Sequence, residues 1–166
     1  MKMRGGILLS KYKGYFILLI IVITLSIVLN EGSSQIGTRA DAASNSKASN
    51  LQLLARAING EARGESYEGQ VAVGAVIINR TRDSRFPKTI AGVIYQHGAF
   101  TAVQDGQINI PIDPKSTSVK AAQAAQNGYD PTNGCTFYWN PATATSKWIW
   151  SIKVGKKIGK HNFGKK

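Results

Sequence analysis

The sequence has one cysteine, two histidines and few acidic residues, and each scarcity excludes a class of protein. One cysteine cannot form an intramolecular disulfide, so packing must stabilise the fold. Two distant histidines with scattered carboxylates do not offer the three ligands of a zinc amidase. We therefore expect neither a metal nor a cofactor. At 166 residues the chain also has no room for two large domains.

The first 42 residues have the pattern of an export signal. Four basic residues between Lys2 and Lys13 precede an apolar run from Tyr15 to Leu29, and Ala40-Asp41-Ala42 matches a small-residue cleavage site. The run is close to the shortest length that spans a bilayer, about 17 residues, so an uncleaved membrane anchor is the alternative. Either way we expect the rest of the chain outside the membrane, in contact with it only through this segment.

The exported part is strongly basic. Residues 43–166 carry 16 Lys and Arg against 7 Asp and Glu, and six of these basic residues lie between Lys153 and Lys166. Such charge attracts polyanions within about 8 Å at physiological salt, and export favours wall polymers or lipid headgroups over nucleic acid. The alternative is that the lysines keep a hairpin edge soluble.

Residues 43–50, rich in Ser, Asn and Ala, are predicted to be a linker, so the domain is expected to cover residues 51–166. Ser49 or Asn50 would cap its first helix. A second helix, from Tyr67 to Arg80, is apolar on nearly all sides and should be central. Small residues in it, Gly74 among them, would let neighbouring elements approach closely.

The remaining pattern changes from helix to strand. Short helices are predicted over residues 90–95, capped by Thr89, and over 116–127. Strands are predicted over residues 136–140, 148–154 and 158–163, with a turn at 155–157 and with Trp148 and Trp150 in the core. The predicted fold class is α+β, with a helical body and a small C-terminal antiparallel sheet.

Three of the seven carboxylates in the exported part fall within eight residues: Glu61, Glu65 and Glu68. If the first helix continues this far, Glu61 and Glu65 share one of its faces, and neighbouring carboxylates favour a proton on one of them. A general acid requires such a proton. Most helical Glu pairs are solvated surface, but Glu61 stands on the apolar side, between Gly60 and Gly64, which would admit a bulky substrate.

Several motifs, in order along the chain, resemble the catalytic domain of spore cortex-lytic enzymes of the SleB and CwlJ kind. The resemblance covers residues 51–164 and is carried by Leu53–Glu65, Tyr67–Val76, Phe86-Pro87, Ala99–Val103, Asp105–Asn109, Phe137–Pro141, Ser146–Trp150 and Ile158–Phe163. It implies a lysozyme-like or lytic-transglycosylase-like fold that acts on peptidoglycan glycan strands with one essential glutamate. That glutamate corresponds to Glu61.

The implied task of Glu61 is to protonate the glycosidic oxygen between muramic acid and glucosamine. In a lytic transglycosylase the same carboxylate then takes the proton of the muramoyl C6 hydroxyl, which closes a 1,6-anhydro ring. A hydrolytic lysozyme would need a second carboxylate, for which Glu65 and Asp105 are the candidates. The sequence leaves both outcomes open, and the resemblance favours the anhydro product.

Candidate substrate-binding residues are aromatic, amide or hydroxyl side chains at matching motif positions. They are Tyr95, Gln96, Phe100, Thr101, Gln107, Tyr138 and Asn140. Gln107 and Asn140 would position the C6 hydroxyl or the N-acetyl group by analogy with the family. The expected partner is peptidoglycan, with other anionic wall polymers such as teichoic acids as further candidates for the lysine-rich tail.

Three other interpretations stay open from the sequence. Cys135 and His161 could form a Cys-His wall peptidase, although nothing marks the thiol as reactive. A wall-binding module that cuts nothing is the non-enzymatic alternative. Finally, longer relatives carry a peptidoglycan-binding domain that does not precede Leu51 here, so the enzyme acts either on spore cortex in germination or as a general wall muramidase. The sequence names no localising partner protein.

Overall fold

The computed structural model describes residues 41–166, and its compact unit Lys47–Lys166 holds the fold discussed below. The predicted apolar run of the export signal lies outside the described residues, so its cleavage stays a prediction. Within residues 41–166, no helix combines the length and the hydropathy that crossing a membrane would require.

The first helix of the unit ends at Ala62. Its start differs from the prediction, because residues 43–50 are helical rather than a linker, and no cap forms at Ser49 or Asn50. Five of these eight residues are Ser or Asn, which are weak helix formers, but the stretch contains no Gly or Pro that would break the helix. Toward its end the helix buries Leu54 and Ile58 completely.

Helix α2, Tyr67–Arg82, is the centre of the unit, as predicted. The Ser66 side chain caps it by accepting a hydrogen bond from the Gly69 N–H at 3.2 Å. Residues 69–77 are all buried, so α2 is covered on every side. At Gly74 an added Cβ would lie 2.8 Å from Ile58 Cδ1 and 3.1 Å from Ala125 Cβ, which shows why a residue without a side chain is needed there.

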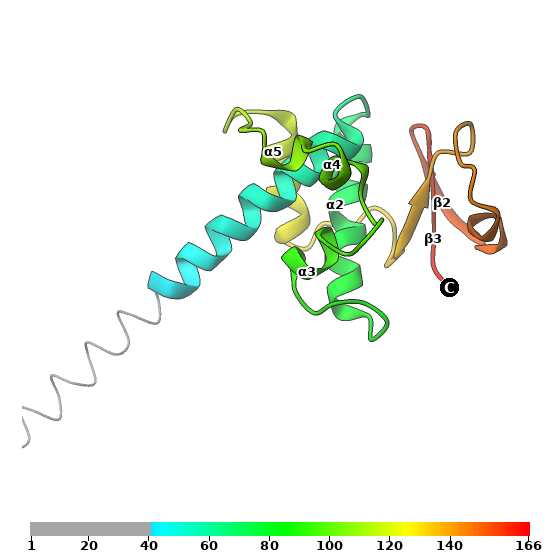
Figure 1. The fold of residues 1–166 in the computed structure, drawn as a ribbon, viewed down its shortest axis with the longest axis horizontal. Helices are drawn as coiled ribbons and strands as arrows, with labels where there is room; N and C mark the ends of the chain where they lie inside the picture. Colours follow the sequence, from blue (N-terminus) through cyan, green and yellow to red (C-terminus); the bar gives the residue numbers. More distant parts are fainter. Residues whose placement is uncertain (1–40) are drawn as a thin grey trace, which may run out of the picture. The chain divides into compact units, whose positions relative to one another are not determined.

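Shorter helices complete the helical body (Figure 1). They are α3 (Ile90–Ile94), α4 (Thr101–Gln104), the 3₁₀-helix η1 (Gln107–Asn109) and α5 (Thr117–Gln126). The predicted cap of α3 is confirmed, since Thr89 accepts from the Gly92 N–H at 3.0 Å. Ser116 caps α5 in the same way, and Gly128 follows its end with a φ of +97°.

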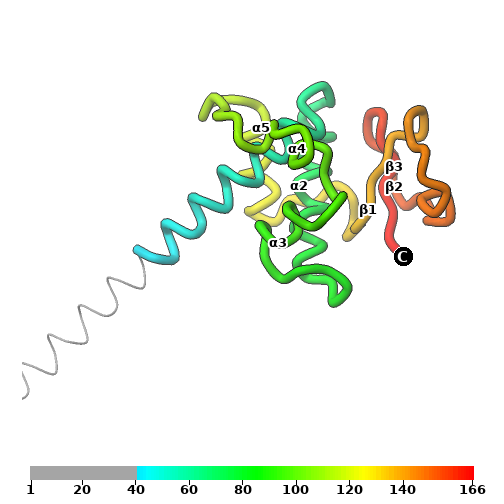
Figure 2. The backbone as a smooth tube through the Cα atoms, in the orientation of Figure 1, coloured from blue at the N-terminus to red at the C-terminus, as the bar shows by residue number. Residues whose placement is uncertain are grey.

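A three-stranded antiparallel sheet completes the unit, and its order is β1-β3-β2. The strands are β1 (Phe137–Trp139), β2 (Val154–Ile158) and β3 (His161–Gly164), with Tyr138 opposite Phe163 in the register of β1 and β3. Figure 2 traces the chain from the helical body through β1 into this sheet, where it ends. Phe163 is fully buried and packs with Ala72 and Val76 of α2, which joins the sheet to the body.

The prediction of a strand over residues 148–154 was wrong. Residues Lys147–Ser151 form the 3₁₀-helix η2, and residues 155–157 belong to β2, so the turn falls instead at Gly159, with a φ of +58°. In a 3₁₀-helix side chains repeat every three residues, and Ile149 and Ile152 accordingly face the core. Trp148 and Trp150 are 54% and 53% exposed rather than buried.

Candidate active site

Glu61 lies in the last turn of the first helix and is held by two elements that are distant in sequence. Its Oε1 accepts a hydrogen bond from the backbone N–H of Ala102 in α4 at 2.9 Å. Its Oε2 accepts one from the Tyr138 hydroxyl in β1 at 3.2 Å. The carboxylate is therefore fixed by one donor from the helical body and one from the sheet.

The Glu61 carboxylate borders an open cavity of about 410 Å³. The end of the first helix forms one wall of this cavity, and the ends of the strands form the other. The lining residues are Gly60–Glu65, Asn140, Thr143, Lys160 and His161. We call it the Glu61 cavity. Its volume falls in the range that accommodates a small organic group such as a sugar ring.

Gly60 brings α4 close to Glu61. An added Cβ at position 60 would lie under 3.0 Å from the Cβ of Ala102 and 3.5 Å from its Cα. From the sequence, the glycines around Glu61 were expected to admit a bulky substrate, but at Gly60 that space is filled by Ala102. Gly64 is different, because an added Cβ there meets nothing within 4 Å. It lies at the open side of the cavity.

Arg80 of α2 supplies a buried positive charge beside this site. The residue is 9% exposed, and its Nε donates to the Thr136 carbonyl at 2.7 Å. Its guanidinium stands 5.3, 5.5 and 5.7 Å from the ring centroids of Phe86, Phe100 and Phe137. Burial lowers the pKa of Arg80, while Tyr138 and Glu61 raise it, and a guanidinium remains charged under these influences.

Tyr138 acts as a hydrogen-bond donor in this arrangement. Burial, followed by the negative charge of Glu61, raises the pKa of Tyr138 well above its ordinary value, against the opposing effect of Arg80. The phenol therefore keeps its proton at neutral pH and points it at Glu61. Its ring also packs edge-on against His161, with centroids 5.5 Å apart.

Replacement of Tyr138 by phenylalanine is expected to lower catalytic turnover by roughly 10-fold or more while leaving the fold intact. Loss of one hydrogen bond to a charged group corresponds to about 1.5–3 kcal/mol, and the ring that packs against Phe163 remains. The turnover number on peptidoglycan and the thermal unfolding midpoint measure the two effects. Unchanged turnover in Tyr138→Phe would show that the phenol does not hold the reacting carboxylate.

Glu65 lies beyond the end of the helix, so the expectation that it shares a helical face with Glu61 was wrong. The helix ends at Ala62, where glycine at position 64 favours a turn, and Glu65 reaches the β2–β3 turn instead. Its Oε2 accepts from the Lys160 N–H at 3.2 Å, and its side chain is only 10% exposed. An added Cβ at Gly159 would lie under 3.0 Å from the same oxygen, and the φ of +58° at this position independently favours glycine.

His161 lies next to Glu65 in the cavity wall. Its Nδ1 is buried, lies 3.9 Å from Glu65 Oε1 and has no hydrogen-bond partner among the described residues. Burial lowers the pKa of His161 below its ordinary value, and Glu65 and Glu61 only partly oppose this. The imidazole is therefore neutral at pH 7.

Acidification is expected to destabilise the protein through His161. Its folded-state pKa lies below the unfolded value of about 6.5, so below that pH the unfolded chain binds more protons than the folded one, and the free energy of unfolding falls as pH falls. Chemical denaturation at pH 7 and pH 5.5 measures this slope. It should be shallower in His161→Gln, and an identical slope in that variant would contradict the assignment.

Comparison with known proteins places the chain in a family. The sequence profile described as cell wall hydrolase matches residues 64–164. The chain belongs to this cell wall hydrolase family. The matched range begins three residues after Glu61, so the role of that residue is argued from its geometry.

Curated relatives of this chain carry the name spore cortex-lytic enzyme. That of Bacillus cereus is 56% identical over 115 residues, which cover 69% of this chain and 44% of the relative. That of Bacillus subtilis is 53% identical over 113 residues, or 68% of this chain and 36% of the relative. The cell wall hydrolase CwlJ of Bacillus subtilis is 43% identical over 60 residues, 34% of this chain and 42% of that protein. The chain thus spans less than half the length of these relatives.

Two solved structures have the same fold. The crystal structure of the catalytic domain of the Bacillus cereus SleB protein matches with a TM-score of 0.66 and 54% identity over 70% of this chain and 89% of that one. The catalytic domain of the germination-specific lytic transglycosylase SleB from Bacillus anthracis matches with a TM-score of 0.67 and 53% identity over 70% and 93%. The predicted fold class, a helical body with a small antiparallel sheet, is confirmed.

The structure brings some of the other predicted site residues to the Glu61 cavity. Asn140 lines it, and its Oδ1 accepts from the Ala142 N–H at 2.9 Å. Gln107 lies beside it, where its side chain bonds both Arg63 and Asp105. Asp105 is exposed and is not in the lining, which leaves Glu65 as the second carboxylate of the cavity.

Other predicted substrate residues lie elsewhere. Phe100 is 2% exposed and packs in the core beneath Arg80, so it offers no face to a sugar. Thr101, the exposed first residue of α4, precedes the Ala102 donor. Tyr95 is 52% exposed at the end of α3 and lines neither the Glu61 cavity nor the second cavity described below. The predicted binding roles of Thr101 and Tyr95 stay predictions.

A second cavity, of about 290 Å³, has Tyr138 and Gln96 in its lining. The prediction missed its aromatic wall, because Trp148 was expected in the core. Trp148 packs edge-on against Phe137, with centroids 5.6 Å apart, while about half of its surface is exposed. An exposed aromatic ring at a cleft is typical of a sugar-stacking position. The incorrect prediction of a strand over residues 148–154 is the reason that Trp148 was not considered as a binding residue.

The structure does not support a Cys-His peptidase. Cys135 lies near the end of β3, whereas His161 is at the start of that strand, and the Cys135 thiol donates to the Thr132 carbonyl at 3.1 Å. Burial raises the pKa of the thiol, the opposite of what a nucleophilic cysteine needs. Within residues 41–166, no three His, Cys, Asp or Glu side chains are grouped so that they could hold a metal ion.

Proposed function

We propose that this protein cleaves peptidoglycan glycan strands between N-acetylmuramic acid and N-acetylglucosamine, with Glu61 as the general acid. The observation that carries this proposal is the Glu61 carboxylate itself. It faces a sugar-sized cavity and is oriented by the Ala102 N–H and the Tyr138 hydroxyl. Membership of the cell wall hydrolase family and relatives named spore cortex-lytic enzyme support the substrate class.

The reaction begins when protonated Glu61 gives its proton to the glycosidic oxygen. The bond from that oxygen to C1 of the muramoyl residue then breaks through an oxocarbenium-like state. Glu61, now a carboxylate, accepts the proton of the muramoyl C6 hydroxyl as its oxygen bonds to C1, which yields a 1,6-anhydro end. The two hydrogen bonds to Glu61 and the positive charge of Arg80 stabilise the carboxylate that forms between these steps.

Hydrolysis is the second candidate outcome, and one observation favours it. Glu65 lines the same cavity as Glu61, and its position is fixed by the Lys160 N–H and by the space left at Gly159. A second carboxylate could activate water or stabilise the cation. The name lytic transglycosylase, which the Bacillus anthracis SleB domain carries, supports the anhydro outcome over this one.

Product analysis separates these outcomes. The full chain is incubated with purified peptidoglycan, and new anhydro-muramic ends, reducing ends and free amines are followed by mass spectrometry and end-group assay. We expect anhydro ends. New reducing ends would assign hydrolysis, free amines a peptidase or amidase, and no new ends a module that only binds the wall. The last two results would overturn the proposal.

The proposed place of action is the spore cortex during germination, reached by export through residues 1–42. Relatives named spore cortex-lytic enzyme support this site, and a general muramidase of the vegetative wall is the alternative. Deletion of the gene in its host should delay germination, and wild type but not Glu61→Gln should restore it. Normal germination in the deletion strain would remove the cortex role without touching the chemistry.

A further inference from the structure

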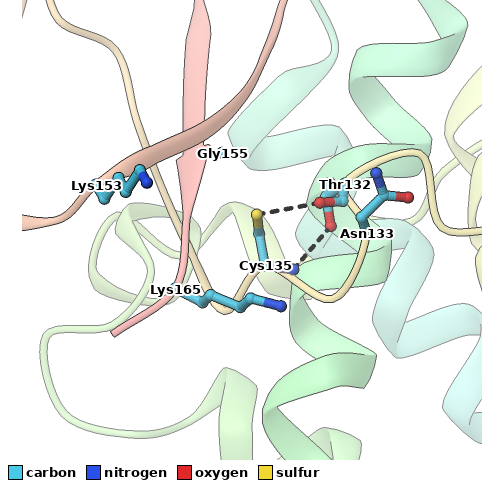
Figure 3. Close-up of a pocket in the computed structure, with 6 residues that line it drawn as sticks. All are labelled: Thr132, Asn133, Cys135, Lys153, Gly155 and Lys165. Atoms are coloured by element: carbon cyan, nitrogen blue, oxygen red, sulfur yellow. Dashed lines mark hydrogen bonds between the residues drawn. The ribbon is translucent and has the colours of Figure 1, made fainter.

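A third cavity, of about 220 Å³, opens at the end of the sheet opposite the Glu61 cavity (Figure 3). The Glu61 cavity meets the sheet where β3 begins, at His161, and this cavity meets it where β3 ends, next to Lys165. A strand of four residues spans about 13 Å. The lining residues are Thr132, Asn133, Cys135, Lys153, Gly155 and Lys165. We call it the lysine cavity.

Two positive charges and no negative one line this cavity. Lys153 lies directly before β2 and Lys165 directly after β3, and Figure 3 shows both among the residues that line the cavity. Neither lysine forms a salt bridge with a carboxylate among residues 41–166. Burial, and after it the negative charge of Asp130, raises the pKa of Cys135, and the positive charge of Lys165 opposes this shift. Unneutralised ammonium groups around a hollow favour an anion.

The carboxylate of Asp130, which lies near the lysine cavity, already accepts four hydrogen bonds. Its two oxygens accept hydrogen bonds from the Thr132 N–H and hydroxyl, the Gly134 N–H and the Asn79 amide, at 2.6 to 2.8 Å. These bonds fold residues 130–134 into a fixed turn, with Thr132 only 2% exposed. The turn thus forms a rigid wall of the cavity, and Asp130 is directed toward the turn rather than toward the lysines.

We propose that the lysine cavity binds an oxyanion, a carboxylate or a phosphate, of the same wall polymer whose glycan strand occupies the Glu61 cavity. The chemistry of the group follows from the two ammonium ions, the Asn133 amide and the small volume. Its origin rests on the proposed function, since peptidoglycan carries carboxylates on its stem peptides and teichoic acids carry phosphates. Binding at both ends of the sheet would hold the polymer in place during cleavage.

The first experiment tests the site with simple anions and needs no enzymatic activity. Amide chemical shifts of the full chain are followed by NMR during titration with inorganic phosphate and with acetate. We expect saturable shifts at Thr132–Cys135 and Gly155, which the double variant Lys153→Gln/Lys165→Gln loses. The control Lys156→Gln/Lys157→Gln removes equal charge from exposed β2 positions outside the cavity and should keep them. Equal loss in both variants, or no saturable shift, would overturn the proposal.

The second experiment identifies the source of the anion. Sedimentation with wall sacculi measures binding in a Glu61→Gln background, so the result does not depend on cleavage. The Lys153/Lys165 variant should bind at least fivefold more weakly than the Lys156/Lys157 control. If acid extraction of teichoic acids abolishes this difference, phosphate is the ligand; if removal of the stem peptides abolishes it, a carboxylate is. Equal binding by the two variants would refute the site even if the proposed cleavage is correct.

Discussion

Glu61→Gln is expected to lower peptidoglycan cleavage by about 10²–10⁴-fold, the usual contribution of a general acid or base. An amide has no proton of suitable acidity to give to the glycosidic oxygen, and it cannot take one from the C6 hydroxyl afterwards. The side-chain carbonyl of the new glutamine can still accept a hydrogen bond from the Ala102 N–H, and its NH₂ group can donate one to the Tyr138 oxygen. Stability should therefore change little.

The release of anhydro-muramic ends per minute measures this effect, and circular dichroism with thermal unfolding confirms that the variant is folded. Glu68→Gln is the matched control, because Glu68 is an exposed carboxylate in the first turn of α2 and lies outside the Glu61 cavity. It should cleave at the wild-type rate. Wild-type activity in a folded Glu61→Gln protein would refute the proposed chemistry.

Gly60→Ala is expected to have the second largest effect, a fall in turnover of about 100-fold. The new methyl group would lie under 3.0 Å from the Ala102 Cβ, which cannot rotate away because it is fixed to the backbone. The first helix and α4 must then separate, and the Ala102 N–H moves with α4. A misplacement of about 1 Å at a reacting group can cost roughly this factor. Overpacking should also cost about 1–3 kcal/mol of stability.

Gly64→Ala provides the comparison, since it adds the same methyl group where nothing lies within 4 Å. It should retain its stability and most of its activity. The turnover number at saturating substrate and urea unfolding of both variants measure the difference. If Gly60→Ala and Gly64→Ala have equal turnover, the close approach of α4 to the first helix does not position Glu61.

Local signals made the helical body predictable. The cap at Thr89 and the glycine after α5 are read from a few neighbouring residues, and the structure has these elements where the sequence placed them. The all-round apolar pattern of α2 likewise depends only on its own composition. The missed helix over residues 43–50 shows the limit of this approach, because a polar composition without Gly or Pro does not exclude a helix.

The C-terminal part was harder because its pattern is ambiguous. Trp148, Trp150 and Ile152 alternate as in a strand, but Ile149 and Ile152 also satisfy a three-residue repeat. Packing of these two isoleucines against Trp139 decides for the 3₁₀-helix. This tertiary contact cannot be inferred from the residues of the segment itself. Because the segment was predicted as a strand, the exposure of Trp148 was not predicted either.

The sequence indicated Glu61 as a candidate, but it did not indicate the residues that hold the Glu61 carboxylate. Glycines next to an acidic residue on an apolar face indicated Glu61. Its partners Ala102 and Tyr138 are 41 and 77 residues away, and only the tertiary fold brings them together. Arg80 gave no signal, since a single basic residue near the end of a helix is usually solvated.

The two groups that hold Glu61 belong to different layers, α4 in the body and β1 in the sheet. Under the proposed chemistry, the catalytic site is complete only once the helical body and the sheet have come together. A chain in which β1 has not yet paired with β3 lacks the Tyr138 donor, so its Glu61 is not fully oriented. Pairing of β1 with β3 would thus keep the proposed cleavage activity off until the C-terminal sheet has folded.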